Sequence, residues 1–286
     1  LLRAQETISG NFLFLIDQGR DLIAVKDIVF NYHPTLIGPY TSLQGVFQGP
    51  LWYYLLAIPI FITQGNPWGT VLLMLLISLS VLLISFFWMK KLFGIPAAMI
   101  TLFLIAISPE AIAAATYAWN PHPMWLLITL FIFLFYEILQ GKQKYHLFLW
   151  STISLMFHFE TALAVFILAA TILYFLFFSF KKLRTKFFLI GLALSGLFFL
   201  PQVLFDIRHD FLMSKSFLSV LSGKNQGLAV TGEKSHSLEL IKGHLDTFII
   251  NYNSSFFHEG FLQNLPLLFF ILLLAGILFA KRFQII

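Results

Sequence analysis

The sequence predicts an all-α protein, a polytopic bundle of membrane helices with extracytoplasmic loops that carry short amphipathic helices. Of its 286 residues, 59% are hydrophobic and only 11% are charged, and the mean hydropathy is +0.86. These values lie far outside the range of soluble domains. The apolar runs are also long and continuous, whereas the strands of a membrane β-barrel alternate apolar and polar residues. A soluble fold and a β-barrel are therefore both excluded.

Charge and cysteine content exclude further classes of site. The formal net charge is +5, but the placement of the basic residues concerns membrane orientation, so we expect no nucleic-acid partner. The chain has no cysteine, which excludes disulfides and Cys-ligated zinc or iron–sulfur sites.

We expect a single transmembrane domain over residues 1–286. Residues 1–69 form a first outer loop with interfacial helices, 70–205 the transmembrane core, 206–264 a long outer loop and 265–286 a last helix. The hydrophobic segments are, in order, Thr70–Met89, Pro96–Ile107, Met124–Leu139, Leu147–Phe157, Thr161–Phe180, Phe187–Leu204 and Leu265–Ala280.

The two ends of the chain indicate truncation. The sequence opens directly on the polar first loop, without an initiator Met. We therefore expect that a first span is missing at the N-terminus; the alternative is that 1–16 is a genuine terminus. Residues 281–286 also stop abruptly, so helices are expected to be missing there too.

Not every hydrophobic segment is long enough to cross a membrane by itself. Several hydrophobic segments are shorter than the ~20 residues of a straight span, so we expect flanking residues such as 111–117 to extend them. Residues 51–63 include Pro59 and are too few to cross, and counting them as a span would place Lys90 and Lys91 outside. We expect an interfacial or re-entrant helix there, with the Trp-Tyr-Tyr run at 52–54 among the lipid headgroups.

Basic residues cluster at alternate junctions, which the positive-inside rule places in the cytoplasm. These junctions contain Lys90, Lys91, Lys142, Lys144, Lys181, Lys182, Arg184, Lys186, Lys281 and Arg282. Every Asp and Glu except Glu137, and every His except His146, then falls on the outer side. We therefore expect an integral, multi-pass protein of a bacterial plasma membrane with its active site on the outer face.

The long outer loop is expected to cover the outer end of the bundle as a lid. Apolar residues recur at helical spacing over Phe211–Leu221 and Leu238–Ile250, which predicts two amphipathic helices. A Gly- and Ser-rich stretch over 222–237 separates them.

The charged cluster at residues 17–21 (Asp-Gln-Gly-Arg-Asp) is the first candidate for chemistry. Asp17 and Asp21 lie four residues apart, so on a helix they share a face with Arg20 beside them. A carboxylate at the membrane surface can act as general base toward an acceptor hydroxyl or amine. The alternative is a solvated charged loop in which Asp17 caps a helix beginning at Gln18.

The second outer turn holds three more candidates. Glu110, Asn120 and His122 lie in a Pro-rich stretch between two apolar segments. If Asp17 lies nearby, these side chains support its site or bind a metal ion. The alternative is a loop punctuated by prolines with a helix N-cap.

Two further clusters lie at the outer ends of later spans. His158 and Glu160 form a turn between apolar helices, where polar groups are usually functional or paired with each other; lining a site is the favoured interpretation. Arg208 and His209 end the next span, and an Arg there suits bidentate binding of a lipid-linked phosphate. The alternative is an interfacial Arg that reaches the headgroups.

Nucleotide, hydrolase and metalloprotease signatures are absent. The chain has no P-loop, no Rossmann glycine fingerprint, no Gly-x-Ser-x-Gly elbow and no His-Glu-x-x-His, and its eight His show no ligand spacing. No cofactor is assigned, and a weakly bound divalent metal ion bridging carboxylates and a phosphate is left open.

An ordered series of motifs over residues 10–209 resembles the GT-C glycosyltransferases of the protein mannosyltransferase and aminoarabinose transferase type, of families 39 and 83 in bacteria. The series comprises the acidic first loop, the Gly-Pro-Leu-Trp-Tyr-Tyr return at 49–54, Lys-Lys-Leu-Phe-Gly at 90–94, Ser-Pro at 108–109, Ala-Trp-Asn-Pro at 118–121 and Phe-Asp-Ile-Arg-His at 205–209. Many members have Lys-Pro-Pro where this chain has Gln-Gly-Pro at 48–50.

The resemblance implies a membrane enzyme that moves a sugar from a polyprenyl-phosphate donor to a glycan, lipid or protein acceptor. By position, Asp17 is the catalytic base, and Glu110 is the carboxylate available on the second outer loop. Because the phosphate-binding lysine of other members is missing, Arg20 or Arg208 takes its place, and Asp21 holds the loop. The alternatives are a transporter or flippase of lipid-linked sugars and a non-catalytic assembly subunit.

Overall fold

The computed structural model describes residues 3–222 and 237–254, and over these ranges the chain is all-α, as the sequence predicts. In the described residues, an isolated bridge between Tyr40 and Phe47 is the only β-type pairing. The helices are α1 (Gln5–Ser9), α2 (Ile16–Phe30), α3 (Leu51–Ile62), α4 (Trp68–Ile107), α5 (Pro109–Thr116), α6 (Met124–Leu139), α7 (His146–Met156), α8 (Thr161–Phe178), α9 (Lys186–Arg208), α10 (Leu212–Leu221) and α11 (Ser237–Ser254), with 3-10 turns η1 (Gln143–Tyr145) and η2 (Phe180–Leu183).

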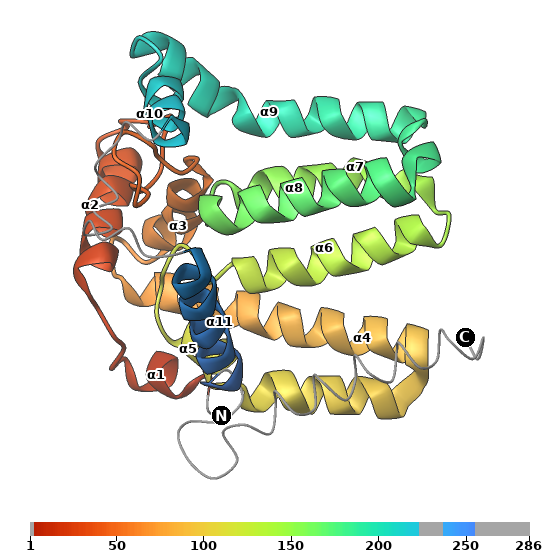
Figure 1. The fold of residues 1–286 in the computed structure, drawn as a ribbon. Helices are drawn as coiled ribbons and strands as arrows, with labels where there is room; N and C mark the ends of the chain where they lie inside the picture. The colour runs from red at the N-terminus through yellow and green to blue at the C-terminus, as the bar shows by residue number, and fades with distance from the viewer. Residues whose placement is uncertain (1–2, 223–236, 255–286) are drawn as a thin grey trace.

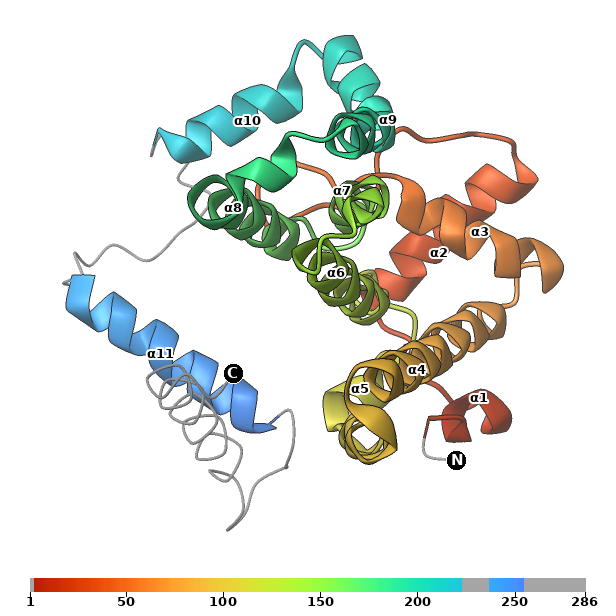
Figure 2. The same ribbon diagram turned by 90° about the vertical axis from the view of Figure 1, so that its right-hand side faces the viewer.

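The helices form a bundle with a cap at one end. Figure 1 shows α4, α6, α7, α8 and α9 running alongside one another, with α2, α3 and α10 gathered at one end. Figure 2, which looks along the bundle, shows α6, α7 and α9 end-on while α2, α3 and α10 lie across that direction. The cap therefore consists of helices that run roughly parallel to the expected membrane plane.

Among the described helices, α4, α8 and α9 are long and apolar enough to cross a membrane, and α3 and α6 are shorter apolar helices. Helix α4 is two helices joined at a break, because Gly94 adopts φ 85° and ψ 178°. Residues 68–93 run from the cap to the far end and residues 95–107 return beside them (Figure 1). A residue with a Cβ is strained at that φ, so glycine fits the turn.

The expected extension of the second apolar segment through residues 111–117 is wrong. Ser108 is extended (φ −60°, ψ 121°) and ends α4, and its side chain caps a separate helix, α5, by accepting from Ala111 N. Pro109 at the first helical position of α5 favours a new start, since it has no N–H to donate to the preceding turn.

The expected placement of the Trp-Tyr-Tyr run among lipid headgroups is also wrong. Trp52 is fully buried in the cluster that joins α2, α3, α4, α6 and α7, and Tyr53 is buried beside it. The hydroxyl of Tyr54 donates to Thr35 O at 2.8 Å. Helix α3 is therefore anchored in protein, and its aromatic side chains join the first loop to the bundle.

The basic junctions meet at the end of the bundle opposite the cap. Glu137 is 1% exposed, ion-pairs with Lys91 (3.0 Å) and binds Lys142. Lys182 Nζ donates to the carbonyls of Ile138 and Leu139 at the C-terminus of α6, where a cation complements the helix dipole. Glu137, the one acid that the charge pattern does not place on the outer side, is thus the ion-pair partner of two basic junctions. The orientation of this end toward the cytoplasm stays a prediction.

The two predicted amphipathic helices of the long loop are present as α10 and α11. Asp206 ties α10 to α9, since its carboxylate accepts from Met213 N (2.6 Å) and from the hydroxyl of Ser214. Helix α11 lies beside the spans in Figure 2 and does not cover the ends of α6 and α7. The predicted last helix at 265–286 and residues 223–236 lie outside the described residues.

Close packing of α9 on α7 yields the first prediction. A Cβ at Gly191 meets His146 O at 2.5 Å, whereas a Cβ at Gly196, on the same helix, meets nothing within 4 Å. Gly191→Ala should lower the free energy of unfolding by about 1–3 kcal/mol through overpacking. Gly196→Ala should raise or preserve it, because alanine favours helix by about 1 kcal/mol. Unfolding of the purified protein in detergent measures both, and equal effects would contradict this packing.

Candidate functional site

A polar cavity of about 580 Å³ opens at the capped end of the bundle. Its volume lies within the range of small-ligand sites. It is lined by Asp17, Arg20, Tyr40, Thr41, Ser42, Leu43, Val46, Gln48, Trp119, Asn120, Pro121, Glu160, Thr161, Ala162, Val165, Phe166 and Phe217. Of the residues predicted from the sequence, four line this polar cavity: Asp17, Arg20, Asn120 and Glu160.

Helix α2 places a guanidinium between two carboxylates. Arg20 Nη1 donates to Asp17 Oδ1 at 2.9 Å, and Arg20 Nε and Nη2 both face Asp21 Oδ1 at 2.8 Å. The side chain of Asp17 is 50% exposed, and its Oδ2 makes no hydrogen bond within the described chain. Gln18, whose side chain accepts from Leu15 N, caps α2, so Asp17 lies inside the first turn and is not the N-cap.

Asp21 joins α2 to α3 beneath the polar cavity. Its side chain is 2% exposed, and Oδ2 accepts from the indole Nε1 of Trp52 at 2.7 Å. Burial raises the pKa of Asp21, while the Trp52 hydrogen bond and Arg20 oppose that rise. The two carboxylates of the cluster are therefore unlike: Asp21 is enclosed by protein partners, and Asp17 faces the cavity.

Two loops distant in sequence are clamped together at the cavity wall. Asn120 Nδ2 donates to Gln48 Oε1 (3.0 Å) and to Phe159 O (2.7 Å), and both Asn120 and Gln48 are buried. The side-chain nitrogen Nε2 of Gln48 makes no hydrogen bond to the part of the chain that is described, whereas its backbone N–H donates to Pro39 O at 2.9 Å, and Gln48 lines the cavity. The side-chain N–H₂ group of Gln48 is therefore a hydrogen-bond donor without a partner in the described residues, at the wall of the polar cavity.

Glu160 brings a second carboxylate to the same cavity. It caps α8, where Oε1 accepts from Ala162 N at 3.3 Å. Partial burial raises the pKa of Glu160, and the Ala162 hydrogen bond opposes that rise. The cavity therefore contains one half-exposed acid on α2 and one capping acid on α8.

His158 does not line the polar cavity and instead contacts the loop return at residues 48–50. Its Nδ1 accepts from Leu51 N (3.3 Å) and its Nε2 therefore carries the proton that binds Phe198 O (3.0 Å). A Cβ on Gly49 would collide with the imidazole ring. Both ring nitrogens of His158 are engaged, so the geometry favours positioning of the 48–50 return over contact with a substrate.

His122 and Glu110 do not line the polar cavity. His122 is buried, donates from Nδ1 to Tyr117 O at 2.8 Å, and has its pKa lowered to about 4 by burial. Glu110 is exposed in the first turn of α5. The structure thus leaves these two side chains outside the lining of the cavity that Asp17 faces.

Arg208 and His209 also lie outside the polar cavity. Both are exposed at the end of α9, and Arg208 makes no hydrogen bond or ion pair to the described residues. His209 stacks on Phe205 with ring centroids 4.0 Å apart. A role for Arg208 in the same site as Asp17 stays a prediction; Arg20 is the guanidinium that shares the cavity with it.

No three His, Asp or Glu side chains within residues 3–222 and 237–254 gather where they could hold a metal ion. Asp17 and Glu160 line the same cavity, but the group nearest to Asp17 is the cation of Arg20. The described donor set does not fit a tightly bound metal, and we assign no chemical step to one.

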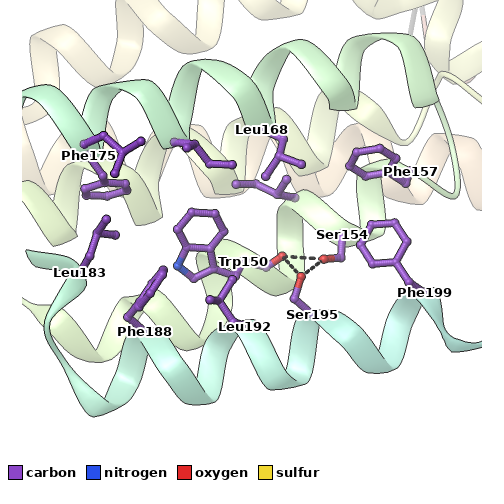
Figure 3. A pocket seen from close by; sticks show the side chains of 13 residues that line it. Trp150, Ser154, Phe157, Leu168, Phe175, Leu183, Phe188, Leu192, Ser195 and Phe199 are labelled. Atoms are coloured by element: carbon purple, nitrogen blue, oxygen red, sulfur yellow. Dashed lines mark hydrogen bonds between the residues drawn. The ribbon is translucent and has the colours of Figure 1, made fainter. Parts of the chain in front are cut away.

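A second, apolar cavity of about 390 Å³ runs between α7, α8 and α9. Figure 3 shows Phe157 and Phe199 at one end of this apolar cavity and Phe175 and Leu183 at the other. Its polar atoms are satisfied internally, because the hydroxyls of Ser154 and Ser195 bind each other and Trp150 O. Its wall therefore suits an aliphatic ligand.

A third cavity, of about 310 Å³, shares lining residues with each of the other two. It shares Val46, Thr161, Val165 and Phe217 with the polar cavity. It shares Phe157 and Phe199 with the apolar cavity. This third cavity, the linking cavity, therefore adjoins both the polar cavity at the cap and the apolar cavity inside the bundle.

Sequence reasoning missed several residues of this arrangement. Gln48 was noted only as a departure from Lys, and Trp119 only as part of a motif. Trp52, assigned to the headgroups, instead binds Asp21. The signal that could have found Trp52 is the buried carboxylate itself, since a buried acid needs donors.

Residues 48–205, more than half of the chain, match the family described as dolichyl-phosphate-mannose-protein mannosyltransferase. The match begins at Gln48 in the loop return and ends at Phe205, so it includes Asn120 and Glu160 but not the α2 cluster. No curated protein and no solved structure matches the chain.

The neutral His158 clamp yields a pH prediction. Burial lowers the pKa of His158 below its usual 6.5, so the unfolded chain binds the proton first as the pH falls. The stabilisation is complete above about pH 6.5 and is lost as the pH falls toward the folded-state pKa. The midpoint of thermal unfolding in detergent should therefore decrease between pH 7.5 and 5.

His158→Gln should be less stable at pH 7.5 and should show a flatter pH dependence than the wild type. His122, whose pKa is also lowered, contributes a slope of the same sign, so slopes are compared between variants. His33→Gln, at an exposed histidine, is the control and should keep the steep slope below pH 6.5. An unchanged slope in His158→Gln would show that the clamp does not titrate in this range.

Proposed function

We propose that this chain, which belongs to the dolichyl-phosphate-mannose-protein mannosyltransferase family, transfers a sugar from a polyprenyl-phosphate donor to an acceptor in the polar cavity. Family membership makes the chain a membrane glycosyltransferase. The identity of the donor, the orientation toward the outer face of a bacterial plasma membrane and the assignment of Asp17 as the base are parts of the proposal.

The observation that carries the proposal is that the three cavities adjoin one another, as their shared lining residues show. A polyprenyl-phosphate sugar has a charged head and a long aliphatic tail, and a site for it needs both environments next to each other. The polar cavity contains Asp17 and Arg20, and the apolar cavity is walled by Phe, Leu and Ile side chains of α7, α8 and α9. The linking cavity lies beside both and shares Phe157 and Phe199 with the apolar cavity.

Asp17 is suited to act as general base. Its Oδ2 is free within the described residues and faces the cavity, while Arg20 fixes Oδ1. In the proposed step Asp17 takes the proton of an acceptor hydroxyl or amine, and the acceptor atom attacks the anomeric carbon of the donor sugar. The bond from that carbon to the phosphate oxygen breaks, and the polyprenyl phosphate leaves with the electron pair.

Arg20 and Gln48 are suited to bind the leaving phosphate. Arg20 lines the cavity, and its guanidinium has more N–H groups than Asp17, Asp21 and the Tyr53 hydroxyl engage. Gln48 adds an amide N–H₂ from the opposite loop. Donors aimed at developing charge in a site of low water content are the usual source of electrostatic stabilisation. A glutamine at position 48 thus supplies a neutral donor where related chains carry a lysine.

The distribution of charge argues against the transporter alternative. A transporter needs broken helices and ionisable groups near the membrane midplane. In the described spans the buried acid Glu137 lies at the junction end with Lys91 and Lys142, and the break at Gly94 lies at that same end (Figure 1). The ionisable groups of the site and of the basic junctions lie at the two ends of the bundle, and the hydroxyls of Ser154 and Ser195 inside it bind each other.

The test of the proposal uses the intact protein in membranes with radiolabelled polyprenyl-phosphate mannose. Asp17→Asn should bind this donor as the wild type does, because the neutral amide still accepts from Arg20. Its transfer of label out of the lipid fraction should fall by about 10²–10⁴-fold, the usual contribution of a general base. Donor binding and label transfer are measured on the same membranes.

Asp27→Asn is the matched control, since Asp27 lies on the same helix, is exposed and does not line the cavity; its transfer should equal that of the wild type. Transfer by Asp17→Asn at the wild-type rate would remove the base assignment. Failure of the wild type to bind the donor would favour the transporter or assembly-subunit alternatives.

A further inference from the structure

We propose that Trp119 is a stacking platform for a sugar ring in the polar cavity, held in place by Tyr117 and His122. The inference rests on the proposed function, because it names the surface that receives the sugar of the same reaction. It concerns a residue to which the base and phosphate assignments give no role.

Trp119 is exposed where the residues on either side of it are buried. Trp119 is 39% exposed, whereas Ala118 and Asn120 are buried. The indole lines the polar cavity together with Asp17 and Arg20. An exposed indole at the wall of a charged cavity offers an apolar face of ring size within reach of the reacting groups.

Neighbouring rings fix the orientation of the indole. Tyr117 lies nearly parallel to Trp119, at 24° with centroids 6.4 Å apart. His122 meets Trp119 edge-on, at 88° and 5.6 Å, and is itself fixed by its hydrogen bond to Tyr117 O. These are favourable aromatic geometries, and they explain why a buried neutral His122 lies beside the cavity without entering it.

The backbone that carries the platform is also anchored. Asn120 binds Gln48 and Phe159 O, so the residue after Trp119 is tied to both other loops of the cavity. A side chain on such a loop loses little freedom when it binds a ligand, and a preorganised surface binds more tightly for that reason.

The chemistry of the cavity fits a pyranose better than a lipid tail. One face of a pyranose presents C–H groups, which carry partial positive charge and pack against the negative face of an aromatic ring. Its edge presents hydroxyls, for which Ser42, Gln48, Glu160 and Thr161 line the same cavity. The apolar cavity, in contrast, offers no such polar edge.

The experiment compares two lipids that differ only in the sugar. Binding of polyprenyl-phosphate mannose and of bare polyprenyl phosphate is measured for the intact wild-type protein, Trp119→Leu and Trp119→Phe. Trp119→Leu should weaken binding of the mannosyl lipid about tenfold and leave the bare lipid unchanged. Trp119→Phe, which retains an aromatic face, should recover most of the loss.

Trp125→Leu is the control, since Trp125 is also partly exposed but does not line the polar cavity; it should bind both lipids as the wild type does. His122→Ala should reproduce part of the Trp119→Leu effect on the mannosyl lipid, because it releases the indole. Thermal unfolding of each variant verifies that it is folded.

The remaining outcomes show whether the stacked sugar ring belongs to the donor or to the acceptor. They also distinguish failure of the platform from failure of the proposed function. If the ring belongs to the acceptor, Trp119→Leu binds both lipids normally and raises the KM of a mannoside acceptor, which still supports a platform. Equal weakening of both lipids, or no change in either lipid or in that KM, overturns the platform alone. A wild type that binds neither lipid overturns the proposed function instead.

Discussion

The buried carboxylate of Asp21 is the constraint on which the site depends. It accepts from Trp52 on α3 and from Arg20 on its own helix, and a buried acid without these donors costs several kcal/mol. The pair of contacts fixes α2 against α3 and aims Arg20 at Asp17. Helix α3 is in turn buried against α4, α6 and α7, so the charged cluster is held in a fixed position relative to the bundle.

The opposite side of the site depends on backbone contacts that leave no room for side chains. Gly49 N donates to Phe157 O at 3.2 Å, and Gly49 lies against the His158 ring. Asn120 completes the arrangement by binding Gln48 and Phe159 O. Three loops that are remote in sequence are thereby held together at the point where the spans α7 and α8 turn, and the cavities meet at that turn.

The sequence predicted the helices well because long apolar runs and basic junctions are direct consequences of a membrane fold. Met124–Leu139 agrees residue for residue, and the turn at 158–160 is where it was expected. For the site, the sequence predicted only the end of the bundle at which it lies, and not the side chains that form it. Which side chains enter the cavity depends on contacts such as Trp52 with Asp21 or Asn120 with Gln48, which join residues 31 and 72 positions apart and leave no local pattern.

The central claim, that adjoining cavities hold the head and the tail of one lipid-linked sugar, is tested most directly by photocrosslinking. Polyprenyl-phosphate mannose with a photoreactive isoprene unit near the phosphate should label peptides containing Phe157 or Phe199. A photoreactive unit farther along the tail should label those containing Phe175 or Leu183, at the other end of the apolar cavity. Labelling confined to α4 and α6, or independent of the position of the photoreactive unit, would contradict the account.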